Sequence, residues 1–364
     1  MRLGVSTKTV ANAYTRPDQL SPELRSRILS TADELGYTGP NPLAGRLRRG
    51  RVGAVGVAYD NALSYAFEDP AAVALLAGAA EVFEPAGASL LLVAGSSDPL
   101  TSVAAATGAL VDALIISSVS QDDPFLRAAL ARNLPTVVID QPVPASSTPA
   151  GQAGPVVPWV GIDDATAANG AAAHLLSLGH RRLGVVSFPM TASAGAGLVD
   201  STAQARTPYQ VTRERLRGYA TALAAAGLDW TDVPVAHGAR STPDGGYAAA
   251  ELLLALSPRP TALLCMSDRL AEGAYHAAAQ RGLSVPQDLS IVGFDDSPPA
   301  DRLSLTTVAN PQRAKGEHAA RAVLQLVEGH SAPARAQLPT RLVIRQSTAP
   351  PPRDARSTRS RGPR

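Results

Sequence analysis

Near its N-terminus the chain reads Gly4-Val5-Ser6-Thr7-Lys8-Thr9-Val10-Ala11-Asn12, which predicts a turn, a helix N-cap and the start of a short helix. Ser6 is the expected cap, because its hydroxyl can accept a hydrogen bond from the free amides of the first turn. The helix is expected to end near Ala13 or Tyr14, with Val10 and Ala13 on its apolar face. Short polar side chains at the start of such a helix are what the reading of base edges in a major groove requires.

A second helix is predicted from Ser21-Pro22-Glu23, which combines a cap, a proline at the first helical position and an acid in the first turn. Gly36 is expected to end this helix, and Tyr37 is expected to pack back onto it. The buried face of the helix is expected at Leu24, Ile28, Leu29 and Leu35.

Residues 40–51 contain four arginines, with Leu47 among them, in the stretch Pro40-Asn41-Pro42-Leu43-Ala44-Gly45-Arg46-Leu47-Arg48-Arg49-Gly50-Arg51. Two interpretations are open for this stretch. It is a solvated linker, or it is a short helix that becomes ordered on DNA. In the second case the arginines contact phosphates and Leu47 inserts between base steps in the minor groove.

The formal net charge of +2 hides an uneven distribution. Residues 1–51 carry nine basic and four acidic side chains, and residues 350–364 carry five arginines and one aspartate, which leaves a net charge of −7 on residues 52–349. A basic N-terminal segment on an acidic body is typical of a phosphate-binding module fused to a domain of another kind. Basic ends can also be merely solvated, so charge alone does not decide for nucleic-acid binding.

Length and composition restrict the class of protein. A chain of 364 residues with 45% hydrophobic side chains suits two or three globular domains. The sequence has no apolar run long enough to span a membrane and no secretory signal, so a soluble cytoplasmic protein is expected. The single cysteine, Cys265, excludes a disulfide framework and is expected to be a small buried side chain.

From residue 52 onward, short apolar runs alternate with helical stretches, which predicts parallel β-α units in doubly wound sheets. A first series has strands at 52–59, 89–93, 113–116 and 136–139, with helices near 70–84, 99–109 and 124–132. A second series has strands at 183–186, 233–236, 262–266 and 290–293, with helices near 211–226, 245–255 and 269–281. Two series predict two similar lobes with a ligand-binding cleft between them, because ligands bind at the carboxyl ends of such strands. Residues 142–158 and 190–208 are expected to be long irregular loops.

The chain resembles the LacI-type family of bacterial transcription repressors. In the N-terminal segment the resemblance runs through Gly4-Val5-Ser6-x-x-Thr9-Val10, Ser21-Pro22-Glu23, Leu35-Gly36-Tyr37 and Asn41-Pro42-Leu43-Ala44. In the body it runs through Gly161-Ile162-Asp163-Asp164, His174-Leu175-Leu176-x-x-Gly179-His180, Arg215-x-x-Gly218-Tyr219, Ser267-Asp268-Arg269-Leu270-Ala271, and residues 285–296 with Leu305-Thr306-Thr307-Val308.

The resemblance implies a helix-turn-helix headpiece in residues 1–40 and a hinge in residues 41–51. Ser6 begins the recognition helix, Thr7, Lys8 and Asn12 fall at its DNA-reading positions, and Leu47 falls on the minor-groove leucine with Ala44 beside it. The family has a further helix before this point, so the headpiece is expected to be truncated. Either the start codon is assigned too far downstream, or the product lacks that helix.

For residues 52–349 the resemblance implies a periplasmic-binding-protein-like core in which the chain crosses between the lobes three times. Lobe one is expected at 52–179 plus 302–328, and lobe two at 180–301 plus 338–349. Residues 350–364, rich in proline and arginine, are expected to form a disordered basic tail.

The same resemblance implies effector contacts at Arg215, Asp268 and Asp163. A carboxylate can accept two hydroxyls of a polyol, and an arginine can donate to a ring oxygen or a carboxylate. Each residue also has a structural interpretation: Asp268 as a helix N-cap, Arg215 in a surface ion pair with Glu214 or a neighbouring acid, and Asp163 at the start of a helix over 164–178. Tyr65 and Phe67 lie where family members place an aromatic side chain over the ligand, and core packing is the alternative for both.

The sequence therefore predicts a transcriptional regulator, a dimer or a dimer of dimers, that binds operator DNA and is controlled by a small molecule such as a sugar. No cofactor, metal site, catalytic constellation or membrane contact is expected; Asp295 and Asp296 are interpreted as a loop rather than as metal ligands. Two alternatives stay open. One is a ligand-binding protein without a DNA function, and the other, for which no nucleophile or phosphate loop is visible, is an enzyme of doubly wound fold.

Overall fold

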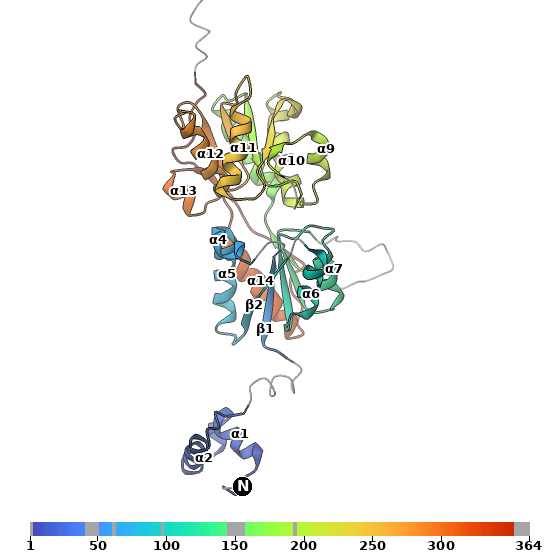
Figure 1. Cartoon of the computed structure of the whole chain (residues 1–364), viewed down its shortest axis with the longest axis vertical. Helices are drawn as coiled ribbons and strands as arrows, with labels where there is room; N and C mark the ends of the chain where they lie inside the picture. The colour runs from blue at the N-terminus through green and yellow to red at the C-terminus, as the bar shows by residue number, and fades with distance from the viewer. Residues whose placement is uncertain are drawn as a thin grey trace, which may run out of the picture.

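The computed structural model describes residues 3–40, 51–59, 63–95, 98–143, 157–191 and 195–352. A small helical headpiece and two α/β lobes follow one another along the long axis of the molecule (Figure 1). The predicted fold class, two doubly wound lobes preceded by a helical headpiece, is confirmed.

The headpiece contains α1 (Thr7–Thr15), a 3-10 turn η1 (Pro17–Gln19) and α2 (Pro22–Glu34). Both predicted caps are present: the Ser6 hydroxyl accepts from the Thr9 amide at 3.1 Å, and the Ser21 hydroxyl accepts from the Leu24 amide at 3.3 Å. Three apolar side chains of the headpiece are buried, namely Ala13, Ile28 and Ala32.

The buried face predicted for α2 is partly wrong. Leu35 is 59% exposed, because it follows the last helical residue and lies at the C-cap, beyond the face that carries Ile28. Tyr37 packs on α1 rather than on α2: its ring lies edge-on to Tyr14 at a centroid distance of 6.1 Å, and the residue is 43% exposed. The predicted hinge residues Ala44 and Leu47 lie outside the described residues.

Lobe one is built on a six-stranded parallel sheet of order β12-β5-β4-β3-β1-β2. Helices α5 and α14 cover one face with a core around Leu75, Phe83 and Val323, and α6 and α7 cover the other with a core around Phe125 and Ile116. The strands are β1 (Ala54–Tyr59), β2 (Ser89–Ala94), β3 (Ala113–Ser117), β4 (Thr136–Ile139), β5 (Trp159–Gly161) and β12 (Arg335–Gln337). The helices are α4 (Tyr65–Glu68), α5 (Pro70–Phe83), α6 (Pro99–Gly108), α7 (Pro124–Ala131) and α14 (Gln312–Val327).

Lobe two is built on a seven-stranded sheet of order β13-β11-β10-β9-β6-β8-β7, whose two edge strands pair antiparallel. The strands are β6 (Leu183–Ser187), β7 (Gly197–Leu198), β8 (Val235–His237), β9 (Ala262–Cys265), β10 (Ser290–Asp295), β11 (Thr306–Ala309) and β13 (Arg341–Val343). The helices are α8 (Asp164–Ser177), α9 (Ser201–Arg206), α10 (Gln210–Ala225), α11 (Pro243–Leu254), α12 (Asp268–Gln280) and α13 (Pro298–Arg302), with a 3-10 turn η2 (Trp230–Asp232). Cys265 is buried in the core of this lobe, as expected.

The chain crosses between the lobes after β5, after β11 and after β12, so the number of crossings agrees with the prediction but the predicted lobe boundaries are wrong. Helix α8 belongs to lobe two, because it packs against α10 so closely that a Cβ atom on Gly218 would lie 2.2 Å from the Ala165 carbonyl oxygen. Strand β11 pairs with β10 in lobe two, and β12 completes the edge of the sheet in lobe one.

The predicted strands of both series are present, with ends that differ by two residues or less in most cases. Five strands, β5, β7, β11, β12 and β13, have no counterpart in the predicted series. The stretch 190–208, expected to be irregular, contains β7 and α9, whereas residues 144–156 of the other expected loop lie outside the described residues. Within the described residues, no helix combines the length and the apolar character that crossing a membrane requires.

Candidate functional site

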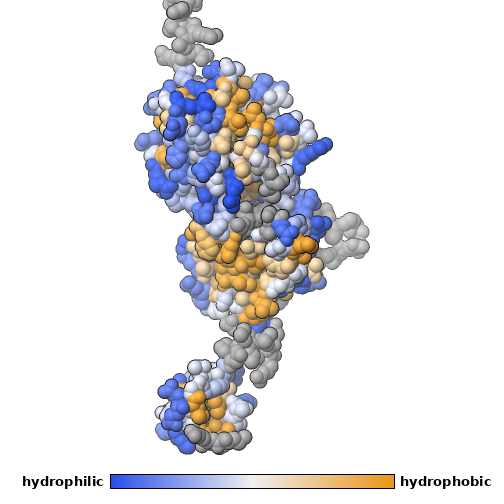
Figure 2. Space-filling model, in the orientation of Figure 1, coloured by the Kyte–Doolittle hydropathy of each residue, from blue (hydrophilic) through white to orange (hydrophobic). Residues whose placement is uncertain are grey.

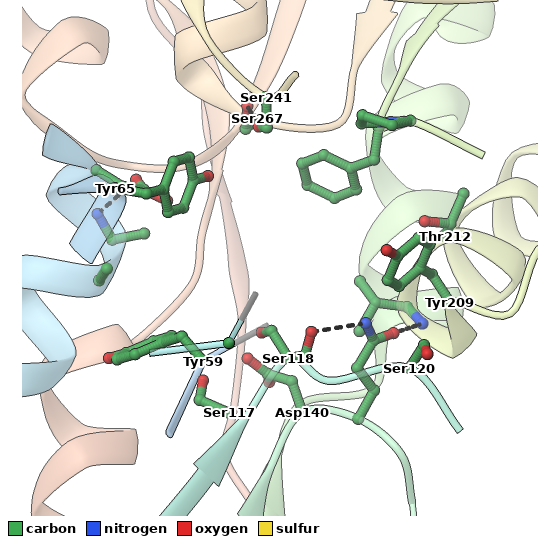
Figure 3. A pocket seen from close by; sticks show the side chains of 18 of the residues that line it. Tyr59, Tyr65, Ser117, Ser118, Ser120, Asp140, Tyr209, Thr212, Ser241 and Ser267 are labelled. Atoms are coloured by element: carbon green, nitrogen blue, oxygen red, sulfur yellow. Dashed lines mark hydrogen bonds between the residues drawn. The ribbon is translucent and has the colours of Figure 1, made fainter. Parts of the chain in front are cut away.

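A cavity of about 810 Å³ lies between the two lobes, where the carboxyl ends of both sets of strands meet. Lobe one contributes segments that follow β1, β3 and β4, and lobe two contributes segments that follow β6, β8, β9 and β10. This is the location that a doubly wound fold predicts for a ligand. Figure 3 shows the polar side chains of the cavity lying on both sides of the open space.

The lining is rich in hydroxyl groups. They come from Tyr59, Tyr65, Ser102, Ser117, Ser118, Ser120, Tyr209, Thr212, Ser241 and Ser267. Four carboxylates and two guanidinium groups complete the set of ionisable side chains, namely Asp69, Asp123, Asp140, Asp295, Arg215 and Arg240. Such a surface offers many directional hydrogen-bond partners and little excess positive charge.

Arg215, a predicted effector contact, lines the cavity and is 4% exposed. Its Nε donates to Asp164 at 2.8 Å and its Nη1 donates to the Met266 carbonyl at 2.5 Å. The guanidinium group lies 3.5 Å from the centre of the Phe294 ring and 5.4 Å from that of Phe188. The alternative of a surface ion pair with Glu214 is wrong, because the Glu214 carboxylate pairs with Arg217 on the outer face of α10.

The carboxylate that pairs with Arg215 belongs to Asp164, one position after the predicted contact residue Asp163. Burial raises the pKa of its carboxyl, and the adjacent Arg215 charge opposes that rise. Asp163, the residue predicted instead, is exposed and lies outside the cavity lining. It caps α8 by accepting from the Thr166 amide and hydroxyl, and these hydrogen bonds lower the pKa of its carboxyl. Its structural interpretation, the start of the 164–178 helix, is therefore the one seen here.

Asp268 is fully buried at the first position of α12 and is not part of the cavity lining. Its carboxylate accepts from the Ser297 amide at 2.7 Å, from the Ser297 hydroxyl at 2.9 Å and from the Thr307 hydroxyl at 2.6 Å. Burial raises the pKa of this carboxyl to about 6. The helix cap itself is Ser267 rather than Asp268. In this arrangement Asp268 fixes the loop after β10 in place instead of facing the cavity.

Asp295, the last residue of β10 immediately before that loop, lines the cavity, although its sequence pattern was interpreted only as a loop. Its backbone has a φ of 116°, a conformation that costs a non-glycine residue energy and that recurs at functional sites. The Asn310 side chain donates to its carboxyl at 3.1 Å. Burial raises the pKa of Asp295 to about 8, so at neutral pH the neutral acid predominates and can donate a hydrogen bond.

Of the two predicted aromatic residues, only Tyr65 is at the cavity. Its ring lies 5.5 Å from the Arg269 guanidinium of lobe two, and burial, with the Asp69 carboxylate nearby, raises the pKa of its hydroxyl. Phe67 is 64% exposed and outside the lining, because α4 is short and residues two positions apart face different sides of a helix. The prediction for Phe67 is therefore wrong in this structure.

A second buried ion pair lies at the floor of the cavity. The Lys315 ammonium, on α14, contacts the Asp140 carboxylate at 2.6 Å, and the two side chains are 1% and 12% exposed. A buried cation and anion of this kind offset each other's charge. Asp140 therefore presents hydrogen-bond acceptors to the cavity with little net charge.

The predicted DNA-reading residues lie on α1 of the headpiece. Thr7 and Lys8 are exposed near its N-terminus, beside the cap residue Ser6. Asn12 is half-buried and donates to the Gln19 side chain at 3.3 Å, which links α1 to the turn before α2. Exposed polar side chains at a helix N-terminus are available to a major groove.

A capped two-helix headpiece joined to two lobes around a polar cavity defines a ligand-responsive DNA-binding protein. A model for a periplasmic binding protein-like domain matches residues 172–348. The chain is 41% identical over 357 residues to the HTH-type transcriptional regulator Rv3575c of Mycobacterium tuberculosis, covering 96% of this chain and 95% of that protein. It is 37% identical over 329 residues to the HTH-type transcriptional regulator IpsA of Corynebacterium glutamicum, covering 90% and 89%.

Solved structures agree with this assignment. A LacI family regulator from Corynebacterium glutamicum is 33% identical, with a TM-score of 0.72 and 96% of each chain covered. The regulator CelR in complex with cellobiose is 27% identical, with a TM-score of 0.68 over 95% of this chain and 97% of that one. The chain belongs to the LacI family of helix-turn-helix transcriptional regulators. It is a DNA-binding regulator of transcription that a small molecule controls.

Proposed function

We propose that the chain is a dimeric repressor and that its effector is a neutral, polyhydroxylated molecule of the sugar class. The observation that carries this proposal is the lining of the cavity between the lobes. Hydroxyl and carboxyl groups of both lobes surround it, and the buried cations Arg215 and Lys315 are each paired with a carboxylate, while the other guanidinium group of the lining, Arg240, is exposed. A phosphorylated effector would need unpaired cations in the buried part of the cavity, whereas a polyol needs alternating donors and acceptors.

Within the cavity, we assign direct effector contacts to Arg215, Tyr65 and Asp295. Arg215 and the neutral Asp295 carboxyl supply donors, and Tyr65 supplies a hydroxyl and an apolar ring face. Asp164 and Asp268 support these contacts without touching the effector. Asp164 accepts a hydrogen bond from Arg215, and Asp268 fixes the loop that directly follows Asp295. The cellobiose bound by the relative CelR supports an effector of this class.

Control of DNA binding follows from the position of the cavity. An effector that contacts both lobes favours one angle between them, and it shifts the equilibrium only by its difference in affinity for the two angles. Lobe one is joined through residues 41–51 to the headpiece, so a change of angle alters the spacing of two headpieces in a dimer. In the headpiece, Thr7, Lys8 and Asn12 are the proposed base-reading residues, and Leu47 with Ala44 is the proposed minor-groove wedge.

The dimer contact that we propose lies on lobe one. Apolar side chains gather on the face that carries α5, β2 and α6 (Figure 2). Among them Val73 is 44% exposed, Leu91 is 39% exposed and Leu100 is 80% exposed. Strand β2 is the edge of its sheet, and large exposed apolar side chains beside a sheet edge are typical of a surface that a second copy covers.

Two measurements test the proposed function. In differential scanning fluorimetry, neutral sugars and cyclic polyols are expected to raise the melting temperature of the full chain, and their phosphorylated counterparts are not. Stabilisation by the phosphorylated compounds alone would contradict the proposed effector class. In a mobility-shift assay with the DNA upstream of the gene, binding is expected to weaken with salt and to change when the stabilising compound is added. Complexes that are unaffected by that compound would contradict the proposed control.

The dimer is tested separately by light scattering after size exclusion. The parent is expected at twice the monomer mass, and Leu100→Asp is expected to shift the population toward monomer. The matched control is Leu198→Asp, because Leu198 is an exposed leucine (55%) on lobe two, away from the proposed face. A parent that elutes as a monomer would contradict the proposed contact.

A further inference from the structure

The lobes are joined by a reciprocal pair of glutamine contacts at the rim of the cavity. On lobe one, the Gln141 side chain follows β4; its Oε1 accepts from the Val211 amide of lobe two at 2.8 Å. On lobe two, the Gln210 side chain begins α10; its Oε1 accepts from the Val143 amide of lobe one at 2.9 Å. Each glutamine therefore satisfies a backbone amide of the opposite lobe.

The Val211 amide lies in the first turn of α10, where the amides of a helix have no partner within the helix. The N-cap residue of α10 is Tyr209, and its side chain makes no capping hydrogen bond. Elsewhere in lobe two, α8, α9, α11 and α12 are capped by an aspartate, serine or threonine of their own chain segment. Helix α10 is therefore capped by a side chain of lobe one, whereas these four helices are capped by the residue that directly precedes them.

The Gln141 side chain is also anchored within lobe one. It is 5% exposed, and its Nε2 donates to the Ser118 carbonyl oxygen at 3.3 Å, which ties the side chain to the end of β3. The dashed lines beside Ser118 in Figure 3 mark the two hydrogen bonds of the Gln141 side chain. One runs to the Ser118 carbonyl oxygen of lobe one, and the other comes from the Val211 amide of lobe two. Arg215, the buried cation of the cavity, lies one helical turn beyond Val211.

We propose that Gln141 and Gln210 form an interlobe latch that caps α10 from lobe one and holds the lobes at the separation seen here. They are positioning residues: they set where α10, and with it Arg215, stands relative to lobe one. When the lobes separate, the Val211 and Val143 amides lose their acceptors together. The latch does not depend on which effector the cavity binds.

The test is a distance measurement on the effector-free full chain. Spin labels are placed on exposed helix positions of the two lobes, as Ala131→Cys on α7 and Ala224→Cys on α10, and their separation is measured by double electron–electron resonance. The native Cys265 is 1% exposed and burial raises the pKa of its thiol, so it does not take up label.

Gln141→Leu and Gln210→Leu are each expected to populate a second, longer distance. The loss of one hydrogen bond of ordinary net strength shifts the equilibrium by about two- to twelvefold. Gln141→Glu keeps an acceptor for the Val211 amide at the helix N-terminus but loses the hydrogen bond to the Ser118 carbonyl, and it is expected to open less than Gln141→Leu. Gln280→Leu, at an exposed glutamine at the end of α12, is the matched control and is expected to change nothing.

Distance distributions of Gln141→Leu and Gln210→Leu that match the parent would overturn the latch. A Gln141→Glu variant that opens as far as Gln141→Leu would overturn the capping role of the side chain. Circular dichroism of each variant accompanies the measurement, and because Gln210 is only half-buried, its variant supplies a test that does not disturb the core.

Discussion

Replacing Arg215 by methionine tests the central ion pair of lobe two. The substitution keeps much of the side-chain volume between Phe188 and Phe294 but removes the charge. It deletes the hydrogen bonds to Asp164 and to the Met266 carbonyl oxygen. It also leaves the Asp164 carboxylate, which is 9% exposed, without a counter-ion. Breaking a buried pair from one side in this way costs about 3–5 kcal/mol of stability.

The cost depends on pH, because an unpaired buried carboxylate can take up a proton instead. An aspartate has an unfolded pKa of 3.8, so protonating it in the folded state costs at most about 1.6 kcal/mol at pH 5 and about 4.4 kcal/mol at pH 7. The folded pKa of Asp164 is raised, so stability is present at low pH and is lost as pH rises toward the folded pKa. Arg215→Met is therefore expected to be destabilised more at pH 7 than at pH 5.

The measurement is urea unfolding of the full chain at both pH values, followed by tryptophan fluorescence, with Trp230 in lobe two as a reporter. The control is the double variant Asp164→Asn, Arg215→Met, which lacks both charges and is expected to regain stability and to lose most of the added pH dependence. A loss below about 1 kcal/mol for Arg215→Met at pH 7, within the range of an ordinary surface substitution, would refute the argument.

Three further predictions concern other parts of the molecule. Asp295→Asn is expected to become more stable relative to the parent as pH rises from 4 to 8, since a folded pKa of about 8 makes the acid lose stability over this window; parallel pH profiles of the melting temperatures would contradict it. Lys8→Ala is expected to weaken operator binding by about 1–3 kcal/mol more than binding to unrelated DNA, because a base contact is lost; equal losses on the two DNAs in a titration would contradict the base-reading role. Gly316→Ala is expected to lower stability by about 1–3 kcal/mol, because a Cβ atom would lie 2.0 Å from the Leu75 carbonyl oxygen. The control is Gly170→Ala, where a Cβ atom would enter open space, and equal melting temperatures of the two variants would contradict the close packing at Gly316.

The sequence predicts those parts of the fold that local patterns determine. The caps at Ser6 and Ser21 and the long buried strands of both series follow from short-range chemistry and from runs of apolar residues. The lobe boundaries do not. Helix α8 could belong to either lobe by its own pattern, and its packing in lobe two is decided by tertiary contacts such as the close approach of Gly218 to Ala165. Short strands such as β12 are defined by the neighbour that they pair with and carry no periodicity of their own.

The sequence predicted the place of the candidate site between the lobes, but only some of its residues. Arg215 and Tyr65 lie at the cavity as expected. Asp163 and Asp268 do not, because a carboxylate beside a helix start can cap, fix a loop or face a ligand, and sequence pattern does not separate these roles. Asp295 was the available alternative: it ends a buried strand of the second series, at the edge where ligands bind.

The return of the chain to lobe one after β11 has a consequence for biosynthesis. Helix α14 packs along α5, and β12 pairs with β5, so lobe one lacks a helix and an edge strand until residue 337 has been made. The headpiece needs only the first forty residues for its two helices. On the ribosome, α1 and α2 are therefore synthesised long before either the cavity or the proposed dimer face can form. A nascent chain would carry the proposed base-reading residues before the lobes that respond to the effector have folded.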